Sequence, residues 1–430
     1  MKLIPCLALL SLLPCSVRAE WNQFRGPNGS GVGEAKGLPA EIDDKSTLWK
    51  IELGAGWSSP VIWGDMVVVT AETGPGKRAA IALNAADGSE RWRHEVSFSE
   101  HKQHKFNSFA SSTPFIDDQR IYVTWTSGND VQAMALDHGG KVLWERTGIA
   151  NYVHEHGSGS SPVVADGVVL VRSEFLLEKN GKALATEEQA GWENCFVGLD
   201  AATGETKWKH TVPHTLNSYG TAVVRELPGG KKEFLIANTS SGFLGVDPAT
   251  GDFNWQHNPG FSQRSVGVLA LKDNLLFGSL GSGGGGKESA VLELSASGLK
   301  GPAKYEIKDG LPYVPSPLVV GDLLYLLNDG GLLSCVEFST GKVVYDKERM
   351  KGKRGSTKYF SSPVYADGKI FCGSQTGEVL TVKEGPKFEI LGVSTLDSPI
   401  NATPAVGNNK LFIRTEKMLW CVGGEGAVVP

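Results

Sequence analysis

Short apolar runs separated by turns rich in glycine and aspartate follow one another along almost the whole chain. A typical unit starts at Ser58, Ser59 and Pro60, passes a Gly-Asp turn, and reaches a second apolar run at residues 66–69. A third run leads to a glycine turn and a tryptophan, Trp92. Short apolar segments bounded by tight turns are typical of antiparallel hairpins. The pattern therefore predicts an all-β protein.

This unit recurs, and eight copies align on the position of its proline. Successive starts are 54, 48, 60, 45, 50, 46 and 41 residues apart, a length that fits four short strands with their turns. The aligned starts are Pro60, Pro114, Pro162, Ala222, Gly267, Pro317, Pro363 and Pro404. One such sheet cannot bury both of its faces alone, so the copies must stack around an axis. The sequence predicts an eight-bladed β-propeller of four-stranded antiparallel blades.

In five copies an aromatic residue follows the turn glycine by four positions, so that a large ring is placed to wedge between neighbouring sheets. The pairs are Gly88 and Trp92, Gly140 and Trp144, Gly204 and Trp208, Gly251 and Trp255, and Gly341 and Tyr345. The eighth copy ends without this outer strand, whereas residues 47–51 look like an orphan copy of it. We therefore expect the N-terminal strand near Trp49 to join the last blade near Trp420 and close the ring.

Residues three positions before each start would stand at the mouth of the axial channel. They are Trp57, Ser111, Gly159, Tyr219, Arg264, Val314, Phe360 and Asn401, with Tyr313, Lys358 and Tyr359 as neighbours. Aromatic rings and cations there can stack on a planar ligand or on a partner's side chain. We predict a ligand site formed by Trp57, Tyr219, Arg264, Tyr313, Lys358, Tyr359 and Asn401. The alternative is that several rings merely plug the channel.

All nine histidines lie between His94 and His257. Five of them fall in connections between copies, which open on one face of a propeller, and form a predicted loop cluster: His101, His104, His154, His156 and His214. Imidazole is a common metal ligand, but these spacings fit no standard zinc motif, so no metal is assigned and a small metalloprotein built on the five histidines stays an open alternative. Cys195, Cys335, Cys372 and Cys421 have no CxxC spacing, and their disulfide state stays open.

The spacing Asp-x-x-Thr-Gly-x-x-x-Trp, at residues 200–208 and 247–255, resembles the tryptophan-docking repeat of pyrroloquinoline quinone (PQQ) propellers. Residues 21–29 are also similar to the start of exported PQQ-like repeat proteins. The resemblance covers about residues 21–424 and implies the propeller fold. The family includes quinoprotein dehydrogenases and the BamB outer-membrane assembly lipoprotein, which has the fold and no cofactor.

Two departures from the family's patterns bear on function. The adjacent cysteine pair of quinoprotein alcohol dehydrogenases is missing, and Pro14 before Cys15 does not match a lipoprotein signal. We therefore predict a non-catalytic, exported binding or assembly platform for a protein or small ligand, with no cofactor. The alternative is a PQQ-dependent dehydrogenase of a sugar or alcohol, with calcium and with Glu155 or Asp397 as the axial carboxylate.

Composition and the chain ends complete the prediction. Residues 1–19 are expected to be a signal peptide, 20–46 an N-terminal extension, 47–424 the propeller and 425–430 a tail. With 42 Lys+Arg against 47 Asp+Glu, nucleic acid is not an expected partner. After residue 19 no apolar run is long enough to span a bilayer. We expect a soluble periplasmic or secreted protein, monomeric because ring closure removes exposed sheet edges.

Overall fold

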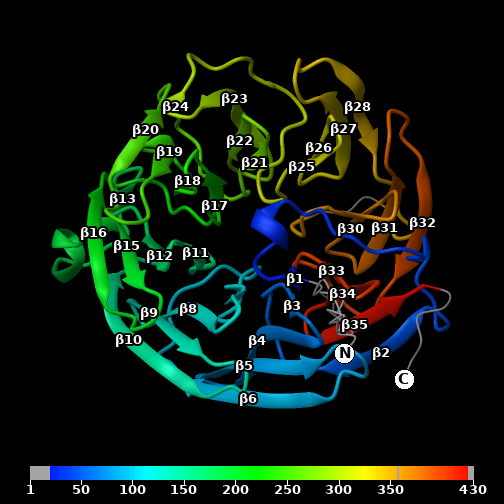
Figure 1. Ribbon diagram of the computed structural model, residues 1–430, viewed down its shortest axis with the longest axis horizontal. Helices are drawn as coiled ribbons and strands as arrows, with labels where there is room; N and C mark the ends of the chain where they lie inside the picture. The colour runs from blue at the N-terminus through cyan, green and yellow to red at the C-terminus, as the bar shows by residue number, and fades with distance from the viewer. Residues whose placement is uncertain (1–19, 356–357, 425–430) are drawn as a thin grey trace, which may run out of the picture.

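The computed structural model describes residues 20–355 and 358–424, which form eight antiparallel blades around a central axis (Figure 1). From the axis outward, blades one to four are β3 (Val61–Trp63), β4 (Met66–Gly74), β5 (Lys77–Asn84), β6 (Glu90–Ser97); β7 (Phe115–Ile116), β8 (Ile121–Ser127), β9 (Asp130–Leu136), β10 (Val142–Asn151); β11 (Val163–Ala165), β12 (Val168–Ser173), β15 (Asn194–Asp200), β16 (Thr206–Val212); and β17 (Val223–Glu226), β18 (Lys232–Asn238), β19 (Gly242–Val246), β20 (Phe253–His257). Blades five to eight are β21 (Ala270–Lys272), β22 (Leu275–Gly281), β23 (Gly286–Ser295), β24 (Gly298–Leu299); β25 (Leu318–Val320), β26 (Leu323–Leu327), β27 (Leu332–Glu337), β28 (Val343–Arg349); β29 (Val364–Ala366), β30 (Lys369–Gly373), β31 (Glu378–Lys383), β32 (Ile390–Thr395); and β33 (Ala405–Gly407), β34 (Lys410–Arg414), β35 (Met418–Gly423), β2 (Thr47–Glu52). The predicted fold is confirmed.

The predicted signal peptide and tail lie outside the described residues, and no described helix has the length and apolar character to cross a membrane.

Each blade starts with a tight hairpin at its inner edge. In blade three, Ala165 pairs with Val168 around Asp166 and Gly167, which both have positive φ (49° and 72°), as the mirror-image turn of a two-residue hairpin requires. Blade five has the same hairpin, but Lys272 pairs with Leu275 there, so Leu269 and not Gly267 stands where six other copies carry proline. The predicted start of the fifth copy was therefore two residues too early. That copy has no proline to mark the position.

Docking tryptophans stabilise several joints between neighbouring blades. Trp92 of blade one packs on Gly140 of blade two, where an added Cβ would lie 2.5 Å from the ring, and its Nε1 donates to the carbonyl of His138 (2.9 Å). Trp144 of blade two makes the same contact with Gly204 of blade three, and Trp208 of blade three makes it with Gly251 of blade four. The tryptophan repeat therefore stabilises the joints between blades, as the spacing predicted.

The ring closes between the two ends of the propeller. Strand β2 pairs with β35, with Trp49 opposite Cys421 and Lys50 opposite Trp420. Trp49 then acts as the docking ring of blade eight, because it packs on Gly88 of blade one and its Nε1 donates to the Ala85 carbonyl (3.3 Å). The predicted closure by the N-terminal strand is confirmed.

Hydroxyl groups just before the inner strands join neighbouring blades in a belt around the axis. Each of these bonds runs from a backbone N–H to the hydroxyl of the next blade, at 2.9–3.0 Å: Ser59 to Thr113, Thr113 to Ser161, Val268 to Ser316, Ser316 to Ser362, Ser362 to Thr403, and Thr403 to Ser59. The Ser-Ser-Pro start of the repeat thus places a hydroxyl that completes the hydrogen bonding of a buried backbone.

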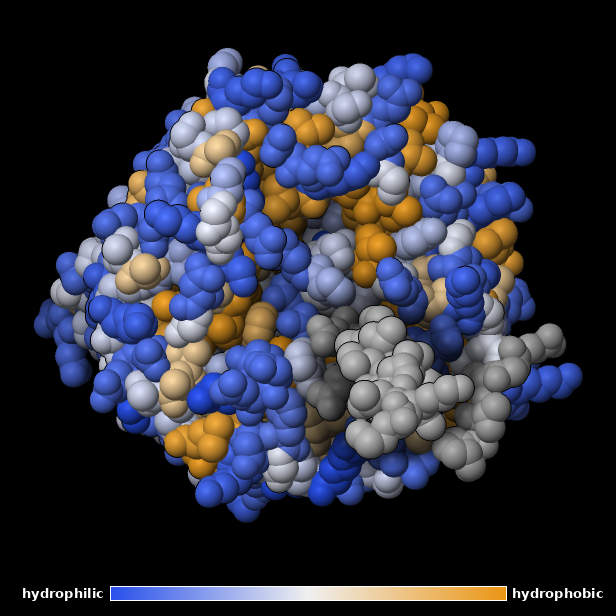
Figure 2. Space-filling model, viewed as in Figure 1, coloured by the Kyte–Doolittle hydropathy of each residue, from blue (hydrophilic) through white to orange (hydrophobic). Residues whose placement is uncertain are grey.

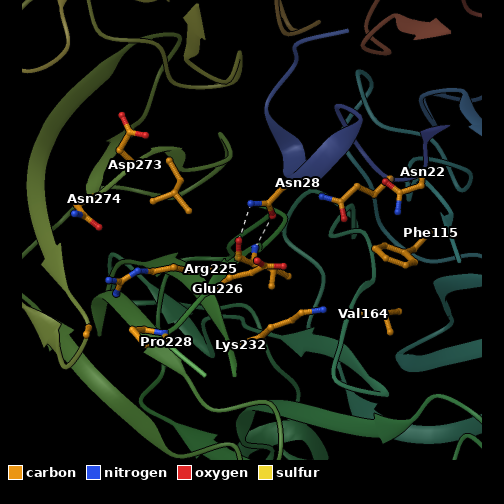
Figure 3. Close-up of a pocket in the computed structure, with 14 residues that line it drawn as sticks. Asn22, Asn28, Phe115, Val164, Arg225, Glu226, Pro228, Lys232, Asp273 and Asn274 are labelled. Atoms are coloured by element: carbon orange, nitrogen blue, oxygen red, sulfur yellow. Dashed lines mark hydrogen bonds between the residues drawn. The ribbon is translucent and has the colours of Figure 1, made fainter. Parts of the chain in front are cut away.

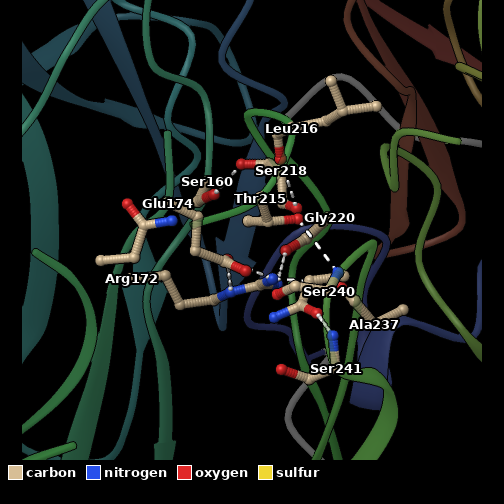
Figure 4. A network of polar contacts seen from close by, with 12 residues as sticks. Ser160, Arg172, Glu174, Thr215, Leu216, Ser218, Gly220, Ala237, Ser240 and Ser241 are labelled. Carbon is tan, nitrogen blue, oxygen red and sulfur yellow. Dashed lines mark hydrogen bonds and ion pairs between the residues drawn. The ribbon is translucent and has the colours of Figure 1, made fainter. Parts of the chain in front are cut away.

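Buried arginines make a second set of joints. Arg172 of blade three donates to Gly220 O (2.5 Å) and Ala237 O (3.0 Å) of the next blade, and its charge is balanced by Glu174 (Figure 4). Burial raises the pKa of Glu174, and the nearby Arg172 charge only partly offsets this. Arg414 joins blade eight to blade one by donating to the Thr70 carbonyl, and Arg78 joins blade one to blade two by donating to the Thr126 carbonyl.

The N-terminal extension crosses the inner strands at one end of the channel (Figure 1). Strand β1 (Glu20–Trp21) adds to β3, the short helix η1 (Pro27–Gly29) follows, and Gly31 and Gly33 pair with Tyr365 of blade seven. The opposite end of the channel carries the connections that lead into each inner strand. The two ends are therefore covered by different parts of the chain.

The insertion in blade three forms a small flap between β12 and β15. It consists of a hairpin, β13 (Glu178–Lys179) and β14 (Lys182–Ala183), and a short helix, η2 (Glu188–Gly191). Its Leu184 and Trp192 pack against the core of blades two to four.

Candidate functional site

A cavity of about 520 Å³ opens at the end of the channel opposite the N-terminal extension. All eight predicted mouth residues line it: Trp57, Ser111, Gly159, Tyr219, Arg264, Val314, Phe360 and Asn401. The repeat brings them together because one position in each copy reaches the same height on the axis. Arg264 stands two residues before the true fifth-copy position, Val266, which also lines the cavity.

The three residues predicted to lie beside the mouth, Tyr313, Lys358 and Tyr359, differ in whether they reach the cavity. Tyr313 and Lys358 line the cavity, whereas Tyr359 is fully buried in the core that blade seven shares with blade six. Successive side chains of an extended segment point to opposite sides, so Lys358 and Phe360 face the cavity when Tyr359 does not. Tyr359 therefore does not belong to this site.

Arg264 is the centre of the polar wall. It donates to Tyr313 Oη (3.3 Å) and forms an ion pair with Glu155, which is only 8% exposed. Lys179 of the flap contacts the other oxygen of Glu155 at 2.6 Å. Burial raises the pKa of Glu155, but the hydrogen bond from Lys179 and the charge of Arg264 outweigh it, so that the pKa lies below its usual value. The glutamate is thus charged and links the flap to the cavity.

Two buried donors of this wall have no protein acceptor among the described residues. They are Arg264 Nε and Tyr219 Oη, and both side chains line the cavity. Burial raises the pKa of Tyr219 well above its usual value, so the hydroxyl keeps its proton and remains a donor. A buried donor without an acceptor is costly, and both residues lie at the cavity wall.

Asp329 lines the same cavity with an exposed fraction of 1%. Its carboxylate accepts the backbone N–H groups of Tyr313 (2.9 Å) and Val314 (3.2 Å) and so fixes that part of the mouth. Burial raises the pKa of Asp329 to about 6, although these hydrogen bonds and Lys358 lower it. The residue can therefore exchange a proton near neutral pH.

Four of the five predicted loop histidines form two pairs. His101 and His154 stack at 3.7 Å with an interplanar angle of 6°, while His104 and His156 meet edge to face at 5.4 Å. Burial lowers the pKa of His154 to about 3 and also lowers that of His101. Only His104 and His156 line the cavity, and His214 lies apart, beside Phe175.

The other predicted groups do not line the cavity. Asp397 accepts the Trp420 indole N–H at 2.8 Å and does not line the cavity, whereas Glu155 lies directly behind its wall. The four cysteines are buried and free, and burial raises their pKa values to about 11 for Cys195 and about 12 for Cys335, Cys372 and Cys421. Among the described residues, no three His, Cys, Asp or Glu side chains are grouped as metal ligands.

Sequence reasoning missed Asp329, Phe106 and Phe24, which complete the wall and floor. Asp329 stands in an Asn-Asp-Gly-Gly stretch that resembles an ordinary hairpin turn. Phe106 lies in the long connection between blades one and two, and the length of this connection is its only signal in the sequence. Phe24 comes from the extension and reaches the cavity along the channel.

Comparison with known proteins supports the fold and its family. Residues 36–194 and 105–274 match the family model described as outer membrane protein assembly factor BamB. The structure is similar to BamB from Moraxella catarrhalis (TM-score 0.63, 15% identity, 88% of this chain and 98% of that chain) and to a europium-containing methanol dehydrogenase (TM-score 0.64, 13% identity, 92% and 89%). A polyvinylalcohol dehydrogenase from Pseudomonas sp is 26% identical over 234 residues, and the match covers 50% of this chain and 33% of the dehydrogenase.

Proposed function

Because the chain belongs to the BamB-like family of PQQ-repeat propellers, we propose that it is a non-catalytic binding propeller of the cell envelope whose axial cavity takes a small planar ligand. The observation that carries the proposal is a cavity of about 520 Å³ whose wall holds two buried donors, Arg264 Nε and Tyr219 Oη, without acceptors in the described chain. Export and a monomeric state belong to the same proposal.

The lining indicates the chemistry of the ligand. Trp57, Phe106 and Phe360 supply aromatic surface, which favours a flat molecule. Arg264 and Tyr219 offer hydrogen-bond donors on one side, which favours an acceptor such as a carboxylate. The ligand class is therefore a planar aromatic carboxylate or a molecule of similar shape and polarity.

The outer surface argues for a cavity ligand over a broad apolar docking face. Of the large hydrophobic side chains among the described residues, Leu143 and Val343 stand out as exposed, at 44% and 58%. The face in Figure 2 shows mainly hydrophilic side chains, with apolar atoms between them. Single exposed apolar residues are normal on a monomer, so the cavity is the best-formed recognition feature.

The second candidate is a PQQ-dependent dehydrogenase, and the match to polyvinylalcohol dehydrogenase favours it. When bound, PQQ would supply the redox chemistry. The residues partly fit this group, because Arg264 would hold a carboxylate and the aromatic side chains would flank the ring system. The adjacent cysteine pair of quinoprotein alcohol dehydrogenases is missing from the sequence. For this reason binding without turnover is the preferred function.

Calorimetric titration separates the two functions. We would titrate the purified chain with PQQ, with and without calcium, and with quinoline-2-carboxylate as a smaller planar carboxylate. The same sample would be assayed for dye-linked oxidation of methanol, glucose and polyvinyl alcohol. Saturable binding of either compound without oxidation is expected. PQQ-dependent oxidation would favour the dehydrogenase, and absence of binding by both compounds would refute the planar carboxylate ligand.

Arg264→Met is the informative variant, because it removes the guanidinium and keeps the apolar stem. Affinity for the bound carboxylate should fall about tenfold or more, as expected for a charge-assisted hydrogen bond. Arg225→Met is the matched control, since Arg225 lies in blade four and does not line the axial cavity. Equal losses in the two variants would show that the effect is not local.

A further inference from the structure

A second cavity, of about 680 Å³, lies beside the N-terminal extension at the other end of the channel (Figure 3). We name it the extension groove. The extension contributes Asn22, Gln23 and Asn28, and the inner strands of blades three, four and five contribute Val164, Val224 and Leu271. In Figure 3, Asn28 reaches from the extension onto the strand below it. No axial-cavity residue is shared with this groove.

The middle residue of each inner strand directs its peptide groups toward the axis. In blade three the tight turn makes Ala165 and Val168 the hydrogen-bonded pair, so that Val164, opposite Val169, is the non-hydrogen-bonded position. Its N–H and C=O therefore point away from its own sheet. Leu271 occupies the same position in blade five, one residue before the Lys272–Leu275 pair.

The extension complements these groups in four other blades. Either backbone or side-chain amides serve as partners: Trp21 pairs with Ile62, Asn22 with Ile116 (2.7 and 3.2 Å), Asn28 with Val224 (2.6 Å for both bonds), and Gly31 and Gly33 with Tyr365 (2.7 and 2.9 Å). The Asn28 side chain is used as a substitute peptide group, because its oxygen accepts from Val224 N–H and its Nδ2 donates to Val224 O. The inner edges thus accept an extended chain in several ways.

Two inner edges in the groove have no such partner. Val164 and Leu271 are half-buried, and their axis-facing peptide groups make no hydrogen bond to any other described residue. Gln23, which is 3% exposed and also lines the groove, has an Nε2 without an acceptor in the same part of the chain. Two unpaired strand edges and the buried Gln23 side chain therefore line one groove.

We propose that the extension groove binds an extended peptide segment of a partner protein, which pairs with Val164 and Leu271 as the extension pairs with the neighbouring blades. Each edge offers one N–H and one C=O on the same residue, and a strand or an amide side chain complements that pair. Lys232, Glu226 and Asp273 add charges of both signs at the groove, and Phe115 adds apolar surface. Such a lining suits a mixed peptide sequence.

The first test observes the two edges directly in the unmodified chain. The probe is the blocked peptide acetyl-Val-Asn-Val-Asn-Val-amide, titrated to millimolar concentration into the ¹⁵N-labelled protein. We expect saturable NMR shifts of the Val164 and Leu271 amides, and none at Val319, the equivalent residue of blade six, which does not line the groove. If neither the Val164 amide nor the Leu271 amide shifts, the proposal is overturned. A response to chitotriose but not to the peptide would also overturn it.

The second test removes one donor. Val164→Pro deletes an N–H that the sheet does not use, and proline is tolerated at such an edge position. Peptide affinity should fall about tenfold, the upper range for one hydrogen bond. Val319→Pro is the matched control and should leave affinity unchanged. An equal loss of peptide affinity in the two variants would overturn the assignment of the site. If Val164→Pro does not fold, the amide shifts of the unmodified chain decide the question. Because the two cavities are separate, PQQ titration of the axial cavity is an independent result.

Discussion

Each end of the channel contains a buried arginine–glutamate pair, and the two pairs are built differently. At the extension end, Arg225 and Glu233 are direct cross-strand partners in blade four, 2.9 Å apart, and Trp255 also donates to Glu233. At the cavity end, Arg264 and Glu155 come from loops 109 positions apart. The first pair is fixed by strand register, whereas the second depends on how separate loops meet.

The two pairs also differ in how completely their polar atoms are hydrogen-bonded. The Glu233 carboxylate accepts hydrogen bonds from Arg225, Trp255 and Asn254, so its oxygens have partners within the blade. Arg264 has a buried Nε without a partner among the described residues. The comparison teaches that the same chemical pair can serve as scaffold when strand register fixes both partners, or as part of a site when separate loops bring the partners together.

Removing the two arginines should give the largest effects and separate the two roles. Arg225→Met leaves Glu233, which is 1% exposed, without its cation, and should lower the free energy of unfolding by about 4 kcal/mol. Arg264→Met should cost about 2 kcal/mol, because Lys179 still compensates Glu155. Urea unfolding followed by tryptophan fluorescence measures both values. An equal or larger loss for Arg264→Met would contradict the comparison.

A second prediction concerns pH at the cavity end. Burial raises the pKa of Asp329 from 3.8 to about 6, so the folded state holds this proton more tightly than the unfolded chain. The resulting stabilisation is fully present below pH 3.8 and is lost as the pH rises through about 6, a change of about 3 kcal/mol. Asp329→Asn has no such proton to lose.

The measurement is the difference in unfolding free energy between the parent chain and Asp329→Asn at pH 3.5 and pH 7. Relative to the variant, the parent should lose about 3 kcal/mol between the two values. Using the difference cancels the titration of other groups, including His154, whose lowered pKa acts in the opposite direction. A difference that stays constant with pH would show that Asp329 does not titrate in this way.

The repeated part of the molecule could be predicted from the sequence, and the reason is its period. A residue such as Trp57 or Phe360 can be placed at the mouth because each copy has the same geometry. The docking role of Trp49 follows from the same argument, since an orphan strand must complete the last blade.

The remaining features depend on segments that do not repeat. The path of the extension, the contact between Lys179 and Glu155, and the inward turn of Asp329 are set by tertiary contacts between residues distant in the chain. The fifth copy shows the limit of the repeat itself, because without its proline the alignment slipped by two residues. Tyr359 was misplaced for a related reason, since neighbouring positions alternate between cavity and core.

The smallest effect is expected at the extension end, from Asn28→Ala. Asn28 makes two hydrogen bonds of 2.6 Å with Val224, but the side chain is exposed, so the loss should be about 1 kcal/mol. Hydrogen exchange at the Val224 amide should accelerate, while exchange at Ile116 should not change, because its amide donates to the Asn22 backbone carbonyl. The variant also frees a third edge in the extension groove. If peptide shifts then appear at Val224 as well as at Val164 and Leu271, the extension and the peptide use the same recognition, and if Val224 stays silent the analogy between them fails.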